Sequence, residues 1–232
     1  MKKLREHVVD PEPLPLFAQV AALPRFQTRR RASRFIELVQ LNPYVRHIVD
    51  RLPRLSVEAA ITSGCLVQTI WNLRQGRAPH RGIDDYDLIY FDPDTTWEKE
   101  DEVIREAEGL FADLEVKVQI RNQARVPLWY REKFGFDYPA VAEAHHSLLR
   151  YPSRSTAVAL TRNAAGDWLF YAPFGLADPH DLRVRPNPKL PLAHVYCSKA
   201  ARWQEEWPQI EVEPWDVPDC SGADCEGQPV RA

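Results

Sequence analysis

Three acidic residues stand at the head of an apolar run, in the segment Ile83-Asp84-Asp85-Tyr86-Asp87-Leu88-Ile89-Tyr90-Phe91. Strand side chains alternate between two faces, so Asp85 and Asp87 are expected to project from one face. Two carboxylates this close repel each other unless a cation lies between them. Mg²⁺ takes oxygen ligands of this kind, often together with a substrate's phosphates. The segment therefore indicates metal-dependent phosphoryl chemistry, and the alternative is an acidic turn that caps backbone N–H groups.

A turn of small residues, Ser63-Gly64-Cys65, leads directly into an apolar helical segment. A helix N-terminus presents unpaired N–H groups and a partial positive charge, which favour phosphate. Gly64 would let a phosphate approach the backbone closely. Because strand–glycine–helix turns are common, this turn by itself favours a structural interpretation, and its functional interpretation depends on the neighbouring acids.

A third carboxylate, Glu115, is expected on the polar face of an alternating strand over residues 114–121. If this strand lies beside the acidic one, Glu115 can join Asp85 and Asp87. Lys117 shares the same face, where it would either neutralise the aspartates or hold phosphate. A solvated strand face is the alternative interpretation for both residues.

The elements that must position these residues follow from hydrophobic periodicity and capping signals. Their order is typical of an α/β or α+β fold, with a short mixed sheet flanked by helices and a loop-rich C-terminal extension. Helices are expected over 33–40, from 43 onward, and over 66–75, 97–112 and 138–149. Strands are expected over 59–62, 85–91, 114–121, 157–160 and 168–171.

The length of 232 residues suits one domain with appendages, and we expect an N-terminal arm (1–30), a domain (31–195) and a mobile, proline-rich C-terminal tail (196–232). A net charge of −3 argues against a broad DNA-binding surface. No apolar run approaches the roughly 20 residues of a membrane span. Cys220 and Cys225 form no CxxC pair and are weak evidence for zinc. We interpret the cysteines as reduced thiols of a cytoplasmic protein.

The combination of turn, acidic strand and later strand resembles the DNA polymerase beta-like nucleotidyltransferase superfamily. It is more similar to one compact, largely uncharacterised bacterial branch, the nucleotidyltransferase-like family, over roughly residues 35–190. The segments that carry the resemblance are Gly64-Cys65-Leu66-Val67-Gln68-Thr69-Ile70-Trp71-Asn72, Ile83 to Asp92, Arg121-Asn122-Gln123-Ala124-Arg125-Val126-Pro127-Leu128-Trp129-Tyr130, Ser155 to Ala159, Ala172-Pro173-Phe174-Gly175-Leu176 and Val184-Arg185-Pro186-Asn187-Pro188.

The resemblance implies transfer of a nucleoside monophosphate from an NTP to an acceptor (a small molecule, a protein or an RNA end), with release of pyrophosphate. It implies Mg²⁺, with Mn²⁺ as an alternative, on a catalytic set of carboxylates. It also implies a nucleotide site in which Asn122 would contact ribose or base and Arg125 would contact phosphate. The alternative is that both residues cap strand ends and pair with Asp92 or Asp94. The implied metal ligands are Asp85, Asp87 and Glu115, and the implied nucleotide contacts are Ser63, Gly64, Cys65, Lys117, Asn122 and Arg125.

The chain departs from the superfamily pattern at several positions. Ser63 precedes the glycine instead of following it, and Pro127 stands where this branch often has histidine. If Lys117 occupies the position of the third carboxylate, the site is one acid short. The rival predictions are then a non-catalytic nucleotide-binding module or an interaction domain. We interpret His145 and His146 as structural residues of a helix and not as metal ligands.

Overall fold

The computed structural model describes residues 25–163 and 165–215 of the chain. Its helices are α1 (Arg25–Val39), α2 (Pro43–Arg51), α3 (Gly64–Arg74), α4 (Trp97–Leu110), α5 (Val126–Phe134), α6 (Ala177–His180) and α7 (Ala193–Glu206), with the 3₁₀ helices η2 (Leu52–Arg54) and η3 (Ala144–Arg150). Its strands are β1 (Ala59–Thr62), β2 (Asp85–Tyr90), β3 (Lys117–Asn122), β4 (Ala159–Arg162), β5 (Trp168–Tyr171), β6 (Arg183–Val184) and β7 (Glu211–Val212). Within these ranges, no helix has the length and apolar character needed to cross a membrane.

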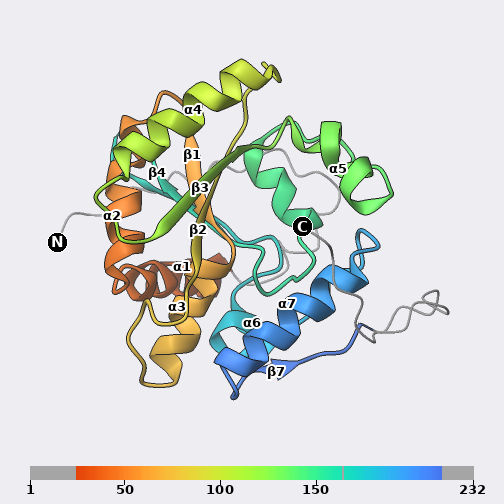
Figure 1. The fold of residues 1–232 in the computed structure, drawn as a ribbon. Coiled ribbons are helices and arrows are strands. Elements are labelled where there is room, and N and C mark those ends of the chain that lie inside the picture. The colour runs from red at the N-terminus through yellow and green to blue at the C-terminus, as the bar shows by residue number, and fades with distance from the viewer. Residues whose placement is uncertain (1–24, 164, 216–232) are drawn as a thin grey trace.

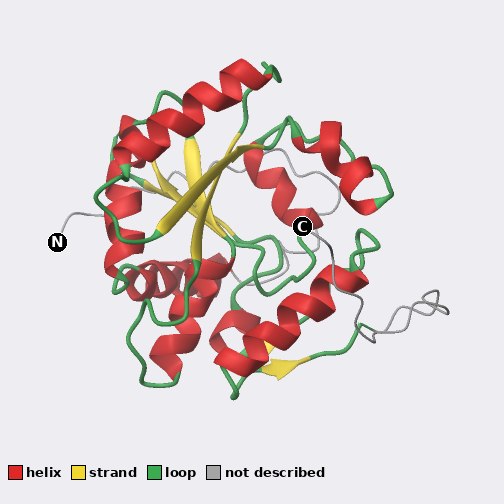
Figure 2. Cartoon of the chain, viewed as in Figure 1, coloured by secondary structure: helices red, strands yellow, loops and turns green. Residues whose placement is uncertain are grey.

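The central sheet is mixed and has the strand order β3-β2-β1-β4-β5. Within this sheet, only the β2–β3 pair is parallel. Helix α4 connects these two strands, because parallel neighbours need a crossover connection. The β1–β2, β1–β4 and β4–β5 pairs are antiparallel. Helices lie on both sides of this sheet (Figures 1 and 2). The expected short mixed sheet flanked by helices is confirmed.

One face of the sheet packs against α1 to α4, which gather on the left in Figure 1. On β2 this face carries Tyr86, Leu88 and Tyr90, which are all buried. Because strand side chains alternate, Asp85 and Asp87 project from the opposite face. The predicted alternation of β3 also agrees with the structure, since Ile120 is buried in the same core.

The opposite face is covered over only part of its width by η3 and the segment that follows it. Leu148 of η3 packs there against Ala60 and Ile89, together with Ala157 and Ala159. These contacts lie on β1, β2 and β4, beyond the acidic start of β2. The two aspartates are therefore on a partly covered face, next to a well-packed apolar cluster.

The C-terminal part of the chain differs from the sequence prediction. Residues 196–206, which the sequence assigns to a tail, belong to α7 in the structure. Tyr196, Ala200 and Trp203 of this helix are buried in the main core. The sequence indicates a short amphipathic piece from about Cys197, and the structure extends it to a helix that begins at Ala193. The indole N–H of Trp207 donates to Asn72 Oδ1 at 2.7 Å, which fixes the end of α7 to α3.

Three further differences concern local structure. α5 follows β3 directly, with Pro127 in its first turn, where the sequence reasoning placed no helix. The helix expected over 138–149 is only η3, and β3 begins at Lys117 instead of residue 114. Most of the predicted arm (1–30) and the Cys220/Cys225 tail lie outside the described residues, although α1 already begins at Arg25.

Candidate active site

Asp85 and Asp87 lie two residues apart on β2, and the charge of Asp85 makes the carboxyl group of Asp87 harder to ionise. Burial and then the charge of Asp85 raise the pKa of Asp87 to about 6. Lys199, Arg121 and Lys117 oppose this increase, in that order of strength. Asp87 is therefore a partly buried carboxylate that is costly to ionise without a nearby cation.

The Ser63-Gly64-Cys65 turn lies beside Asp87 because Thr62, the last residue of β1, pairs with Asp87 in the ladder. Ser63 has φ 69° and ψ −136°, a conformation that L-residues with a Cβ rarely adopt. Its N–H donates to Val158 O at 3.0 Å, which helps to hold this conformation. Backbone strain of this kind concentrates at ligand-binding turns.

The turn can serve an anion through its backbone more readily than through its side chains. The first N–H groups of α3 have no intrahelical acceptor, because a helix bonds each N–H to a carbonyl four residues earlier. The Cys65 thiol, in contrast, is buried and donates to Thr62 O at 3.4 Å. Burial, followed by the charges of Asp87 and Asp85, raises the pKa of this thiol. Cys65 is thus placed to contribute its amide to a ligand, while its sulfur packs in the core.

The parallel β2–β3 register determines which residue of β3 faces each aspartate. Lys117 lies opposite Asp85, and Gln119 lies opposite Asp87. Glu115 precedes β3, is exposed, and pairs with neither aspartate. An amide cannot accept a proton as a base at neutral pH, so Gln119 does not replace a third carboxylate. The structure thus brings together two of the three predicted acids.

Helix α7 supplies basic residues that the sequence reasoning did not place at the site. Lys199 acts on Asp87 more strongly than any other positive group. Arg202, one turn further along, donates from Nη1 to Asp84 Oδ2 at 3.5 Å. The signal that could have located α7 is an apolar spacing of four, three and four residues through Tyr196, Ala200, Trp203 and Trp207, all of which are buried.

A small pocket of about 240 Å³ opens between α3, the start of β2 and α7, next to Asp85. Its walls combine carboxylates with Arg202 and two indole rings. It is smaller than the roughly 300–1,000 Å³ typical of organic ligand sites. The lining residues are Gln68, Gly82, Asp84, Asp85, Arg202, Trp203, Glu205, Glu206 and Trp207.

The structure does not bring Asn122 and Arg125 to the aspartates. Asn122 ends β3 three residues, or about 10 Å, beyond Gln119, which lies opposite Asp87, and Arg125 follows the strand. Asn122 accepts from Asp92 N–H at 3.1 Å and donates to Asp92 O at 2.9 Å. Arg125 forms an ion pair with Glu100, with 2.7 Å between Nε and Oε2. These contacts brace the loop after β2 and the start of α4.

The donor set around Asp87 fits a hard divalent cation. Two carboxylates share one face of β2, and the pKa of Asp87 is raised by burial and then by the charge of Asp85, both of which a bound cation would offset. Oxygen ligands from one or two carboxylates, completed by water and substrate phosphates, are the usual environment of protein-bound Mg²⁺. The N-terminus of α3 then offers a second, anion-binding surface next to this cation position.

This fold, with a small-residue turn and an acidic pair on adjoining elements, is typical of nucleotidyltransferases. A family described as "Nucleotidyltransferase" matches residues 53–212, and the chain belongs to this family. The chain is thus a transferase of the class that the resemblance implied, and its family acts on nucleotides and generally uses divalent metals.

Among solved structures, the chain is similar to one described by the words "The NMR structure of the protein reveals a CCA-adding enzyme head domain". The match has a TM-score of 0.65 and 24% identity, and covers 78% of this chain and 95% of the other, which shows a common fold. A "tRNA-processing enzyme (apo form 2)" matches at a TM-score of 0.39 and 17% identity, over 67% of this chain and 41% of the other. No curated protein matches the chain.

Proposed function

We propose that the protein transfers a nucleoside monophosphate from an NTP to an acceptor hydroxyl, with Mg²⁺ held by Asp85 and Asp87. In this reaction the acceptor oxygen bonds to the α-phosphorus, the bond to pyrophosphate breaks, and the acceptor proton is released. The observation that carries the proposal is the acidic pair beside the turn at the N-terminus of α3. Burial and Asp85 raise the pKa of Asp87 to about 6, which supports a cation-binding role for it.

The chain's own residues would act mainly by positioning and by neutralising charge, the two main needs of phosphoryl transfer. The amides of the first turn of α3 would hold phosphate oxygens, with Ser63 shaping the turn. Lys117 and Lys199 lie near enough to act on the charge of Asp87 and would counter the negative charge of the triphosphate. Mg²⁺, or Mn²⁺ in its place, would be held by Asp85 and Asp87 and would supply positive charge that stabilises the phosphates during transfer.

A second candidate function is a nucleotide-binding module without catalysis. The observation that favours it is Gln119, which lies opposite Asp87 where a third carboxylate would be placed to take the acceptor proton. A module of this kind binds Mg²⁺ and NTP but releases no pyrophosphate. The two functions therefore differ in the release of pyrophosphate, which can be measured directly.

The test combines binding and turnover. Binding of each NTP to the full chain is followed by calorimetry while Mg²⁺ is titrated, and pyrophosphate release is then measured with RNA ends, proteins and small alcohols as acceptors. We expect Mg²⁺-dependent NTP binding in the wild type and its loss in Asp87→Ala. Asp84→Ala is the matched control, since its side chain is 72% exposed and pairs with Arg202. NTP binding that is equal in wild type and Asp87→Ala would refute the assignment, whereas binding without pyrophosphate would favour the non-catalytic module.

A further inference from the structure

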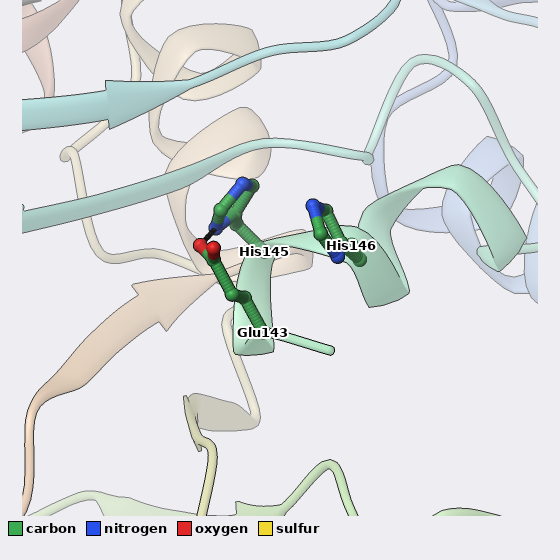
Figure 3. A group of neighbouring side chains, drawn as sticks. All are labelled: Glu143, His145 and His146. Carbon is green, nitrogen blue, oxygen red and sulfur yellow. Dashed lines mark ion pairs between the residues drawn. The ribbon is translucent and has the colours of Figure 1, made fainter. Parts of the chain in front are cut away.

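A second group of metal-ligating side chains lies at the start of η3. Glu143, His145 and His146 each offer one ligand atom, and these atoms lie within 4.8 Å of one another. Figure 3 shows the carboxylate of Glu143 beside the ring of His145, with the ring of His146 next to it. The sequence predicts a structural role for the two histidines, because neighbours on a regular helix point in different directions.

This group is separate from the acidic pair on β2. The ring of His145 stacks on Tyr171 of β5, with 4.4 Å between centroids and 15° between planes. In the sheet register, Tyr171 pairs with Ala159, Ala159 with Thr62, and Thr62 with Asp87. Three steps of about 4.8 Å between neighbouring strands place Tyr171 about 14 Å from Asp87. An ion bound by the histidines would therefore be a different ion from one bound by Asp87.

The spacing within the group already suits a bound ion. His145 Nδ1 lies 3.2 Å from Glu143 Oε2. Two ligands of a tetrahedral Zn²⁺, at about 2.0–2.2 Å from the metal, are separated by about 3.3–3.6 Å. The ring of His146 lies 4.5 Å from that of His145 between centroids, so it needs only a small movement to contribute a third ligand.

The environment of His145 also favours a ligand role. Its side chain is only 13% exposed, and the stack on Tyr171 holds the ring orientation in advance. An ion pair with Glu143 would account for the position of His145 Nδ1 but not for the approach of the His146 ring.

We propose that Glu143, His145 and His146 form a site for a divalent transition-metal ion of the Zn²⁺ type, with water completing the coordination. Imidazole nitrogen suits Zn²⁺, Cu²⁺ or Ni²⁺, whereas Mg²⁺ prefers oxygen ligands in an octahedral arrangement. The inference is independent of the proposed nucleotidyl transfer, because it requires neither Asp87 nor a nucleotide.

Such an ion would stabilise the segment that covers the sheet next to the candidate active site. The ion would link Glu143, His145 and His146 at the start of η3, where His145 packs on Tyr171 of β5. At the end of the same segment, the hydroxyl of Tyr151 lies 3.2 Å from Thr62 Oγ1, and Thr62 pairs with Asp87. We therefore expect Zn²⁺ to raise the melting temperature of the full chain, by an amount that grows with the logarithm of the free Zn²⁺ concentration above its dissociation constant.

The test is metal binding by the full chain after treatment with a chelator. Zn²⁺ is titrated by calorimetry, and Co²⁺ is used as a spectroscopic probe whose visible bands report nitrogen and oxygen ligands. We expect one ion per chain that excess Mg²⁺ does not displace. Binding is expected to weaken at least about tenfold in His146→Ala and in the exposed variant Glu143→Gln. Glu143→Gln keeps the test decisive if His146→Ala fails to fold.

Two controls separate this site from other metal-binding groups. His180→Ala removes a histidine whose Nδ1 lies 3.1 Å from Asp181 Oδ1. This acid–histidine pair has nearly the same length, and no third ligand lies with it among the described residues. Asp87→Asn removes the other proposed cation ligand. Both controls are expected to keep Zn²⁺ binding unchanged. Equal Zn²⁺ affinity in wild type, Glu143→Gln and any folded His146→Ala would overturn the proposal, as would loss of binding in either control or thiolate bands in the Co²⁺ spectrum.

Discussion

Replacing Asp87 by asparagine should stabilise the metal-free protein while removing its response to Mg²⁺. Asparagine has nearly the same shape as aspartate and cannot ionise. The pKa of Asp87 is raised from 3.8 to about 6, mainly by burial and then by Asp85. A shift of about two pKa units corresponds to about 3 kcal/mol between the two protonation states. This value is the largest gain expected for Asp87→Asn at neutral pH.

The sign of the pH dependence follows from the raised pKa. An acid with a higher pKa in the folded state than in the unfolded chain binds its proton more tightly when folded. Its contribution to stability is complete below about pH 4 and is lost as the pH rises through about 6. The wild type and Asp87→Asn should therefore be similar in stability at pH 4 and differ by up to about 3 kcal/mol above pH 7.

The assay is urea unfolding of both proteins between pH 4 and 8, with and without Mg²⁺. At 100 times its dissociation constant, Mg²⁺ should stabilise the wild type by about 2.7 kcal/mol and leave Asp87→Asn unchanged. Asp84→Asn is the control, and its exposed side chain predicts a change within about 0.5 kcal/mol at every pH. The reasoning is refuted if Asp87→Asn is less stable than the wild type at pH 8, or if Mg²⁺ stabilises both equally.

The remaining predictions concern residues around the same strands. Gln119→Glu places a third carboxylate opposite Asp87, so it should lower the stability of the metal-free protein and raise its affinity for Mg²⁺. An unchanged Mg²⁺ affinity in calorimetry would contradict the β2–β3 register. Lys199→Ala removes the strongest positive group acting on Asp87; it should raise the pKa of Asp87 further, measurable by NMR titration, and weaken NTP binding. Glu100→Gln leaves Arg125 without its buried ion-pair partner; it should cost about 3–5 kcal/mol in denaturant unfolding. In folded Glu100→Gln protein the Mg²⁺ affinity should be unchanged, and a large loss would instead place this pair in the site.

The parts of the site that could be predicted from sequence are those fixed by local geometry. Asp85 and Asp87 share a face because a strand alternates, and this holds in any sheet that contains them. The turn at Ser63 could be located because small residues between a strand and an amphipathic helix are a short-range signal. The polar and apolar faces of β3 followed from the same alternation, although its first residue is Lys117 instead of residue 114.

The parts that could not be predicted depend on register and on contacts between distant segments. The residue opposite Asp87 is set by how β3 lies along β2, and a shift of two residues would have brought Lys117 or Arg121 to that position instead. Glu115 was chosen from alternation alone, which determines the face of a strand but not the position along its neighbour. For Arg125 the sequence leaves open a phosphate contact or a bracing role at the strand end, and its ion pair with Glu100 depends on the docking of α4.

By itself, the sequence determined the class of fold, the acidic pair and the phosphate-compatible turn, since short-range periodicity and backbone preferences dictate them. Only the tertiary structure decided that Gln119 faces Asp87, that α7 packs in the core and brings Lys199 to the site, and that Glu143 meets His145 and His146. Such arrangements arise from the register between strands, the docking of helices and a local 3₁₀ turn. The free energy of these contacts depends on segments that are far apart in the chain or on a turn geometry that residue spacing alone does not specify.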